Sequence, residues 1–510
     1  MLALPVPPPA PAAIAPDVRI DGAIGADDRG SVRDLAFDVP ADVTQIRVTF
    51  TLNGPKGAQV TLGIADPQRS RGWGGGVKKA FVIDEGFATP SFLAGPIPAG
   101  RWHLTMTVAS IRAADRATYH ADIHFTRRGD RPVGAFPNAP VAGGPGWYRG
   151  DLHSHTGHSD ARCRSLSGRN IPCPLFLTTQ AGTDAGLDFL AVTDHNVTSH
   201  FAELAVAQEY FDTLVLLPGR EITTRFGHAN LIGTTAVLDL SRAGEAGVSI
   251  NPILKAAHAT GGFLSINHPA TPTGEDCLGC GWVASDTDYS LIDGVEVANG
   301  DTIDDFRGDP YRAKGAHLRV WERLLDRGYR LTGVGGSDNH DAVQGRQPQP
   351  SSIGRQSPVG IPATIVHACA RAGDALVAGL KRGRVFVDIA GRRDRLLDLT
   401  LTARGRRAAM GEVLAIGAAR DVRGTVHVRG VAGAHPVLRI GGSDRRIALP
   451  PVAGDDAIVP FRVADVRQAL WVRADIVDAA GATILVGNPV YLDRGADPDA
   501  DRSRGDECAG

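Results

Sequence analysis

Hydrophobic and polar residues follow different rhythms in successive parts of this chain. Between about Val18 and Thr126, short runs such as VTQIRVTFTL and RWHLTMTVASI alternate or stay apolar, and Gly, Pro and Asp separate them. A period of two residues is typical of half-buried strands, and closely spaced turn signals favour a β-sandwich. We therefore expect an N-terminal β-sandwich over residues 18–131, preceded by a Pro/Ala-rich arm over residues 1–17.

After a Pro/Gly-rich linker at residues 132–146, apolar strands alternate with helical stretches. The strands read LDFLAVTD, LVLLPGRE, GGFLSINH and IDGVEVAN, and the helices read NPILKAAHATG and HLRVWERLLDRG. This alternation favours a parallel α/β sheet or barrel, which we place at residues 147–392. Short β-runs return at residues 393–493 and predict a C-terminal β-sandwich, followed by a polar, mobile tail at residues 494–510.

Composition changes this picture only by exclusion. A chain of 510 residues is expected to hold two or three domains. The net charge is −2 and there is no basic block, which argues against binding of long nucleic acids. No run of about eighteen apolar residues occurs, so no membrane-spanning helix is expected. Residues 1–16 lack the cationic start and unbroken apolar stretch of a signal peptide. We expect either a flexible Pro/Ala arm or a numbering that begins inside a longer precursor.

Six cysteines bear on the cellular compartment. Cys163 and Cys173 bracket a short polar loop, and Cys277 and Cys280 form a CxxC motif. One CxxC supplies two thiolates, too few for a structural zinc site without other ligands. The cysteines are then scattered thiols, or they form two local disulfides in an oxidising compartment. The second interpretation predicts a periplasmic or secreted protein, and a cytoplasmic location is the alternative.

Ionisable residues follow the ends of most strands in the predicted α/β domain. In a (β/α) barrel the C-terminal ends of all strands converge on one mouth, so these side chains are expected to meet. Buried ionisable groups are costly unless they are paired or bind a metal, which favours a metal site. The set comprises Asp151, His153, His155, Asp160, Asp194, His195, Glu221, His228, His268, Asp338 and His340.

The spacing within this set carries its own logic. Residues i and i+2 of a strand point the same way, so His153 and His155 can bind one ion together, and Asp338 and His340 have the same relation. Imidazole with carboxylate suits Zn²⁺, Mn²⁺ or Fe²⁺ better than Mg²⁺ or Ca²⁺. The other histidines are interpreted as ordinary surface or core residues, namely His103, His120, His124, His200, His258, His317, His367, His427 and His435.

These motifs carry a family resemblance. DLHSHTGHSD, AVTDHN, GRE, INHP and GSDNH, in this order, resemble the successive motifs of the PHP (polymerase and histidinol phosphatase) domain. Within it, the chain most resembles the carbaryl hydrolase-like metallohydrolases, the CehA/McbA branch. The match covers roughly residues 147–389. It implies a distorted seven-stranded (β/α) barrel. The fold class that we expect is therefore α/β, with this barrel flanked by an N-terminal and a C-terminal β-sandwich.

The resemblance also implies two or three divalent metal ions, with zinc first and manganese or iron as alternatives. By motif, the first ion would be held by His153, His155, Glu221 and Asp338. Glu221 would bridge to a second ion held with His228 and His268, and Asp160, His195 and His340 would hold the third. The sequence departs from the motifs in two ways. His158 lies close enough to Asp160 to compete with it, and the short spacing from Glu221 must turn His228 back into the mouth.

Such a site predicts a hydrolase that acts on a small-molecule ester. A metal lowers the pKa of its bound water and produces a hydroxide nucleophile, which serves phosphoesters and carboxyl or carbamate esters alike. We name Asp338 and His158 as catalytic residues, His158 as the acid that protonates the leaving group. Asp194 is expected to face away from the site or to orient a ligand.

Phosphoesters are the preferred substrate class, with a carbamate or aryl ester as the alternative. Arginine or lysine near the metals would favour phosphate. Arg220 precedes Glu221 in a strand, so its side chain should point away from the site. Phosphate recognition stays an alternative because of the arginines and the lysine in predicted loops, namely Arg162, Arg164, Arg169, Arg225 and Lys314. Two other classes are a non-catalytic, metal-stabilised carbohydrate-binding protein and an exonuclease. The oligomeric state is left open.

Overall fold

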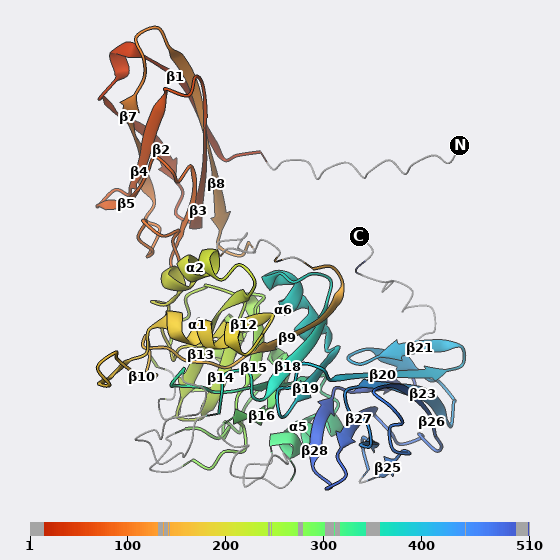
Figure 1. Cartoon of the computed structure of the whole chain (residues 1–510). Coiled ribbons are helices and arrows are strands. Elements are labelled where there is room, and N and C mark those ends of the chain that lie inside the picture. The colour runs from red at the N-terminus through yellow and green to blue at the C-terminus, as the bar shows by residue number, and fades with distance from the viewer. Residues whose placement is uncertain are drawn as a thin grey trace, which may run out of the picture. The chain divides into compact units, whose positions relative to one another are not determined.

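The computed structural model describes residues 15–130, 136, 141, 143–242, 245, 247–273, 279–300, 311, 317–342, 357–443, 445–495 and 508. Most of the predicted arm, linker and tail lies outside these residues. The chain divides into two compact units, Met1–Ala135 and Phe136–Gly510, and Figure 1 labels many of their strands and helices. No helix in the described part of the chain is long and apolar enough to span a membrane.

The first unit contains two four-stranded antiparallel sheets, in the orders β1-β8-β3-β6 and β2-β7-β4-β5. Alternate residues of both sheets turn inward, and buried side chains such as Ile46, Leu62 and Trp102 form one apolar core. The two-residue period of the sequence therefore has its expected physical result. The strands are β1 (Val18–Gly25), β2 (Val32–Val39), β3 (Val43–Asn53), β4 (Gln59–Ala65), β5 (Ser70–Gly75), β6 (Ala80–Asp84), β7 (Gly100–Ser110) and β8 (Arg116–Arg127).

The second unit begins with seven neighbouring strands in the order β9-β12-β13-β14-β15-β16-β17. The first and last strands of this run meet beyond their ends, because a parallel bridge joins Ser154, after β9, to Asn339, after β17. The backbone N–H of Asp338 donates to the carbonyl of His153 at 2.9 Å. The strands are β9 (Gly146–Asp151), β12 (Phe189–Val192), β13 (Val215–Thr224), β14 (Gly227–Ile232), β15 (Phe263–Ile266), β16 (Gly294–Asn299) and β17 (Thr332–Gly336).

Helices connect most but not all of these strands. In α5, the buried residues Leu318, Trp321 and Leu325 recur with helical spacing, so one apolar face packs on the sheet. α6 is capped by Gly383, the residue after its last turn, whose φ of 78° suits glycine at a helix C-terminus. The helices are α1 (Leu175–Asp184), α2 (Phe201–Tyr210), α3 (Asn251–Ala259), α5 (His317–Asp326) and α6 (Gly373–Arg382).

The link between β13 and β14 departs from the alternation of strand and helix. These strands form an antiparallel hairpin, and β14 is also antiparallel to β15. Gly227 lies at the turn with φ 138°, and a Cβ there would lie 2.4 Å from the Trp282 ring. The hairpin pairs Thr223 with His228, so the chain reverses at once and brings His228 back toward the end of β13.

The rest of the second unit is β-structure that continues from the same sheet. β18 pairs with β9, and the sheet runs on through β19, β28, β27, β24 and β25. A separate sheet has the order β21-β20-β23-β26 and contributes to the same apolar core as the continuing strands. The strands are β18 (Ala363–Ala368), β19 (Val385–Asp388), β20 (Leu396–Ala403), β21 (Arg406–Ala409), β22 (Val413–Ala415), β23 (Val422–Arg429), β24 (His435–Ile440), β25 (Arg446–Ala448), β26 (Asp456–Val463), β27 (Trp471–Val477), β28 (Thr483–Gly487) and β29 (Val490–Asp493).

The chain is thus a mixed α/β protein that is mostly sheet with few helices. The sheet crosses the predicted boundary between residues 392 and 393 without a break, and both sides belong to one compact unit. The finer expectations, a PHP barrel flanked by two β-sandwiches with the stated domain limits, stay predictions.

Five of the described cysteines, all in the second unit, are disulfide-bonded. Cys163, in β10 (Arg162–Arg164), bonds to Cys173 directly after β11 (Asn170–Pro172). This is one of the two local bridges considered from the sequence. Cys280 is also disulfide-bonded, and Cys277 lies outside the described residues. Cys369 bonds to Cys508, which is 139 residues away in sequence.

Candidate metal centre

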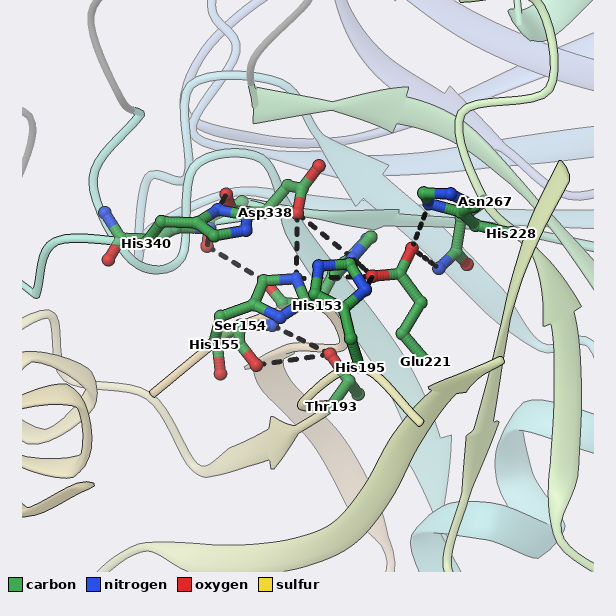
Figure 2. A network of polar contacts seen from close by, with 12 residues as sticks. His153, Ser154, His155, Thr193, His195, Glu221, His228, Asn267, Asp338 and His340 are labelled. Carbon is green, nitrogen blue, oxygen red and sulfur yellow. Dashed lines mark hydrogen bonds and ion pairs between the residues drawn. The ribbon is translucent and has the colours of Figure 1, made fainter. Parts of the chain in front are cut away.

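The side chains predicted to form a metal site gather at the strand ends of the seven-stranded run. His153 and His155 follow β9, His195 follows β12, and His268 follows β15. Glu221 lies in β13. Figure 2 shows His153, His155 and His195 beside Glu221 and Asp338, with His340 at one side of the group. Convergence at the carboxyl ends of the strands is what the sequence led us to expect.

Glu221 lies at the centre of this cluster and is fully buried. Its Oε2 atom lies 3.3 Å from Nε2 of His153, 3.4 Å from Nε2 of His155 and 3.0 Å from Nδ1 of His195. On the other side, Oε1 lies 3.1 Å from Nδ1 of His228 and 3.4 Å from Nε2 of His268. One carboxylate therefore faces five imidazole rings.

Asp338 is the second carboxylate of the cluster. Its Oδ1 lies 3.1 Å from Nε2 of His153 and 3.0 Å from Nε2 of His155. The φ angle of Asp338 is 54°, in the left-handed region that non-glycine residues rarely adopt. Backbone strain of this kind persists where surrounding contacts enforce it and often marks functional sites.

Asp160, His195 and His340 form the outer side of the cluster. Oδ2 of Asp160 lies 3.6 Å from Nε2 of His195, and Oδ1 lies 3.4 Å from Nε2 of His340. The side chain of Asp160 is 59% exposed, whereas that of Glu221 is 1% exposed. The cluster is therefore open to solvent on this side and closed on the other.

Polar atoms inside the cluster fit a metal better than they fit each other. Nε2 of His153, Nδ1 of His155, Nε2 of His228 and Oε2 of Glu221 are buried and make no hydrogen bond, although Nε2 of His153 lies 3.3 Å from Oε2 of Glu221. Buried polar atoms without partners are rare in native proteins, and a bound ion is one explanation for them. Nitrogen and carboxylate donors suit divalent transition metals.

Among the described residues, four sets of possible ligands have donor atoms within 4.8 Å of one another. All nine residues predicted as ligands occur in at least one set. The sets are His155, Asp160, His195 and His340; His153, His155 and Asp338; His153, Glu221 and His268; and His195, Glu221 and His228. The grouping differs from the implied assignment, because His155 also lies with the outer residues and His195 also lies with Glu221 and His228. The assignment of each residue to a particular ion stays a prediction.

Burial and mutual charge set the protonation of the side chains in the cluster. Burial lowers the pKa of His153, but the carboxylates of Asp338 and Glu221 outweigh it and raise this pKa well above its ordinary value. Burial and the neighbouring His340 lower the pKa of His155 to about 4. Despite their burial, Glu221 and Asp338 have pKa values well below the ordinary range, since histidines surround them. The carboxylates are therefore ionised, as metal ligation requires.

His158 turns toward α2. Its Nδ1 atom lies 2.9 Å from Oγ of Ser199, and its Nε2 atom lies 2.9 Å from Oε2 of Glu203. Both ring nitrogens are thus occupied by partners at the start of α2. This arrangement does not favour competition with Asp160 or transfer of a proton to a leaving group, and the catalytic role of His158 stays a prediction.

Asp194 supports the loop that carries Asp160. Its carboxylate accepts the backbone N–H of Thr156 at 2.8 Å, the Thr156 hydroxyl at 2.7 Å and the Ser159 hydroxyl at 2.6 Å. Among the described residues, it occurs in no candidate ligand set. Asp194 therefore supports the loop that carries Asp160, and its role in orienting a metal ligand stays a prediction.

The residues considered for phosphate recognition lie in different surroundings. Arg220 is buried and donates to the carbonyl of Ala236, so it turns away from the cluster as expected. The guanidinium carbon of Arg225 lies 4.8 Å from the ring centre of Phe226. Lys314 lies outside the described residues. The histidines interpreted as ordinary occur in no candidate ligand set among the described residues.

Glu296 is a buried carboxylate beside the cluster that the sequence analysis did not single out. It lies in β16, where the sequence reads GVEVAN, and its Oε1 is 3.1 Å from Nδ1 of His153. A charged residue between two valines of a fully buried strand was the available signal, because such a charge requires a partner. Among the described residues, Glu296 belongs to no candidate ligand set.

Comparison with known proteins adds little to this geometry. No family model matches the chain, and no curated protein matches it. Among solved structures, the chain is similar to a two-domain protein from Bacteroides vulgatus described as containing a predicted PHP-like metal-dependent phosphoesterase. That match has 17% identity and a TM-score of 0.36, and it covers 70% of this chain and 100% of that protein.

Proposed function

We propose that this protein is a metal-dependent hydrolase that cleaves phosphoesters of small molecules. The supporting observation is the environment of Glu221, a fully buried carboxylate within 3.4 Å of five imidazole rings. Several of these imidazoles leave a ring nitrogen without a hydrogen bond. A protein gains little stability from such an arrangement by itself, because burial of charged and polar groups is costly. Ligation of divalent ions accounts for it.

The overlap between ligand sets favours a multinuclear site. Glu221, His153, His155 and His195 each belong to two sets, so the candidate positions lie close together. Adjacent ions are typical of phosphoesterases, where they hold the attacking and the leaving oxygen of an in-line displacement. This closeness is our reason to prefer a phosphoester over a carbamate or aryl ester.

Each part of the cluster has a distinct task in this proposal. Bound divalent ions would lower the pKa of a coordinated water toward neutrality and would polarise the ester oxygen. The buried side of the cluster would bind an ion through Glu221, Asp338, His153 and His155. Asp160, His195 and His340 face solvent, so a substrate would approach from there. Asn267 donates to Oε1 of Glu221 at 2.9 Å and fixes the direction of that carboxylate.

Metal type and cellular location belong to the same proposal. A donor set of imidazole nitrogens and carboxylate oxygens favours zinc, with manganese or iron as alternatives. The disulfides Cys163–Cys173 and Cys369–Cys508 support an oxidising compartment, because such bonds persist mainly in secreted and periplasmic proteins. We therefore place the protein in the periplasm or outside the cell.

One experiment tests the proposal directly. Metal content per chain is measured on native protein, and hydrolysis is measured with p-nitrophenyl phosphate, bis-p-nitrophenyl phosphate and 1-naphthyl N-methylcarbamate. We expect two or three ions per chain and chelator-sensitive cleavage of a phosphate ester, both lost in Glu221→Gln. Cleavage of the carbamate alone would change the substrate class. A protein that neither contains nor takes up metal would overturn the proposal.

A further inference from the structure

Glu296 uses both of its carboxylate oxygens to hold residues of the cluster. Oε1 lies 3.1 Å from Nδ1 of His153, on the ring edge opposite the Nε2 atom that faces Glu221 and Asp338. Oε2 accepts the backbone N–H of His268 at 2.8 Å. A single side chain in β16 therefore contacts cluster residues that follow two other strands, β9 and β15.

Asn299 extends this arrangement to a third strand. Its Nδ2 atom donates to Oε2 of Glu296 at 3.0 Å and lies 3.2 Å from Oδ2 of Asp338, the residue after Ser337 at the end of β17. The three contacts meet at one buried carboxylate, which is 2% exposed. Displacement of Glu296 would therefore disturb His153, His268 and Asp338 together.

The local backbone directs the side chain of Glu296 into this position, and neighbouring atoms pack closely around it. The pairing of β16 with β17 shifts register between Glu296 and Ala298, and such irregularities often re-aim a side chain beside an active site. On the facing strand, a Cβ on Gly336 would lie 3.1 Å from Oε1 of Glu296 and 2.4 Å from Cβ of His153. Only glycine at that position lets the two side chains meet.

The chemistry of imidazole gives the contact with His153 its significance. Ligation requires the neutral imidazole, which carries one proton, so a ring that then donates from Nδ1 presents an unprotonated Nε2. The other histidine held by Glu296 has a matching arrangement, because Nδ1 of His268 lies 2.9 Å from the carbonyl of Cys280. Partners on Nδ1 therefore prepare Nε2 of both rings to bind an ion.

We propose that Glu296 is a positioning residue, which fixes the tautomer of His153 and the backbone of His268 so that both present Nε2 to one ion. This inference rests on the proposed metal-dependent function. Glu296 itself is not a ligand, because it lies behind the ring of His153. Carboxylates that orient a ligating histidine in this way typically contribute about 10- to 100-fold to metal affinity or activity.

Glu296→Gln is the decisive substitution, because it keeps shape and removes only charge and one acceptor. If the amide oxygen faces His153, the amide NH₂ confronts the N–H groups of His268 and Asn299. If the amide is flipped, its NH₂ donates to Nδ1 of His153 and moves the ring proton to Nε2, where it blocks ligation. Either orientation damages one ligand.

Asp388→Asn is the matched control. Asp388 is also a fully buried carboxylate at a strand end, and it accepts the backbone N–H groups of Ala390 and Arg392 at 3.0 and 3.1 Å. Among the described residues it occurs in no candidate ligand set. The control therefore reproduces the loss of a buried charge without touching the cluster.

Cobalt(II) titration of the metal-free protein supplies the readout, through the d–d absorption that reports ligand number and geometry. We expect Glu296→Gln to bind Co²⁺ about 10- to 100-fold more weakly with an altered spectrum, and Asp388→Asn to match the wild type. If Glu296→Gln does not fold, Asn299→Ala must produce the same spectral change to a smaller degree. A wild-type protein that binds no Co²⁺ contradicts the metal-dependent function. Wild-type binding with an unaltered spectrum in the variant overturns the positioning role alone.

Discussion

Nε2 of His155 lies 3.0 Å from Oδ1 of Asp338, although 183 residues separate the two in the chain. Only the closure of the seven-stranded run brings them together, since the bridge between Ser154 and Asn339 lies beside them. The innermost part of the cluster is thus a product of the complete fold rather than of a local motif.

Asp338→Asn is expected to abolish function without unfolding the protein. The substitution removes a charged oxygen that faces His153 and His155, so we predict a loss of bound metal and a fall in kcat of at least about 100-fold, beyond the effect usual for groups behind the ligands. Metal analysis, turnover and circular dichroism check this. Retention of full metal content and turnover would remove Asp338 from the site.

Chelation is expected to lower the thermal stability of the second unit. An ion that binds only the folded state adds free energy of unfolding by mass action, about 4 kcal/mol at a thousandfold excess over Kd. Removal of metal should therefore lower Tm, and added Zn²⁺ should restore it. The matched variant Glu221→Gln should respond little to either treatment. An identical chelator response in wild type and variant would mean that the ions bind elsewhere.

Loss of the Cys163–Cys173 disulfide is expected to loosen the outer side of the cluster. The bridge closes the short β10–β11 hairpin, and the backbone N–H of Arg162 in that hairpin donates to the carbonyl of His340 at 2.7 Å. For such a short loop we predict a cost of about 2–3 kcal/mol in the free energy of unfolding. A double Cys→Ala variant, compared with wild type by denaturant unfolding and metal content, checks this. Unchanged stability would contradict the prediction.

Asp84 gives the first unit a pH dependence. Burial, together with the nearby Glu85, raises the pKa of Asp84 to about 6 from its ordinary 3.8. The folded state therefore binds this proton more tightly than the unfolded state does. Its stabilising contribution is complete below about pH 3.8 and is lost as the pH rises through about 6.

Asp84→Asn should remove this loss. Above pH 6 the variant is expected to be more stable than wild type by on the order of 2–3 kcal/mol, and near pH 4 the difference should vanish. Asp66→Asn is the control with opposite sign. Despite partial burial, backbone N–H groups and Arg71 lower the pKa of Asp66, so that variant should be destabilised at neutral pH. Calorimetry across this pH range distinguishes the two cases.

The residues of the cluster could be predicted from the sequence, but most of the residues and contacts that position them could not. Most of the cluster residues were recognisable because they follow the apolar runs that the sequence predicts as strands, and strand ends converge in this type of sheet. The arrangement of individual donors could not be foreseen. The approach of His155 to the outer residues, for example, depends on side-chain directions that a linear pattern does not encode.

Other features depended on distant contacts. The β13–β14 hairpin replaces a helix, and the only sign of it was the short spacing between Glu221 and His228. The pairing of Cys369 with Cys508 spans 139 residues, and nothing local specifies it. Glu296 was overlooked because one carboxylate in an apolar strand does not reveal which residues it will hold.

The hairpin also affects the order in which the site can form. Glu221 and His228 lie seven residues apart, and their contact needs only a single β-turn. Hairpins form within microseconds, whereas pairing of distant strands is slow. During synthesis the ribosome releases this acid and imidazole well before Asp338 exists. Under the proposed function, the hairpin would therefore supply the first two donors of the metal site, and the later strands would add the others as they fold.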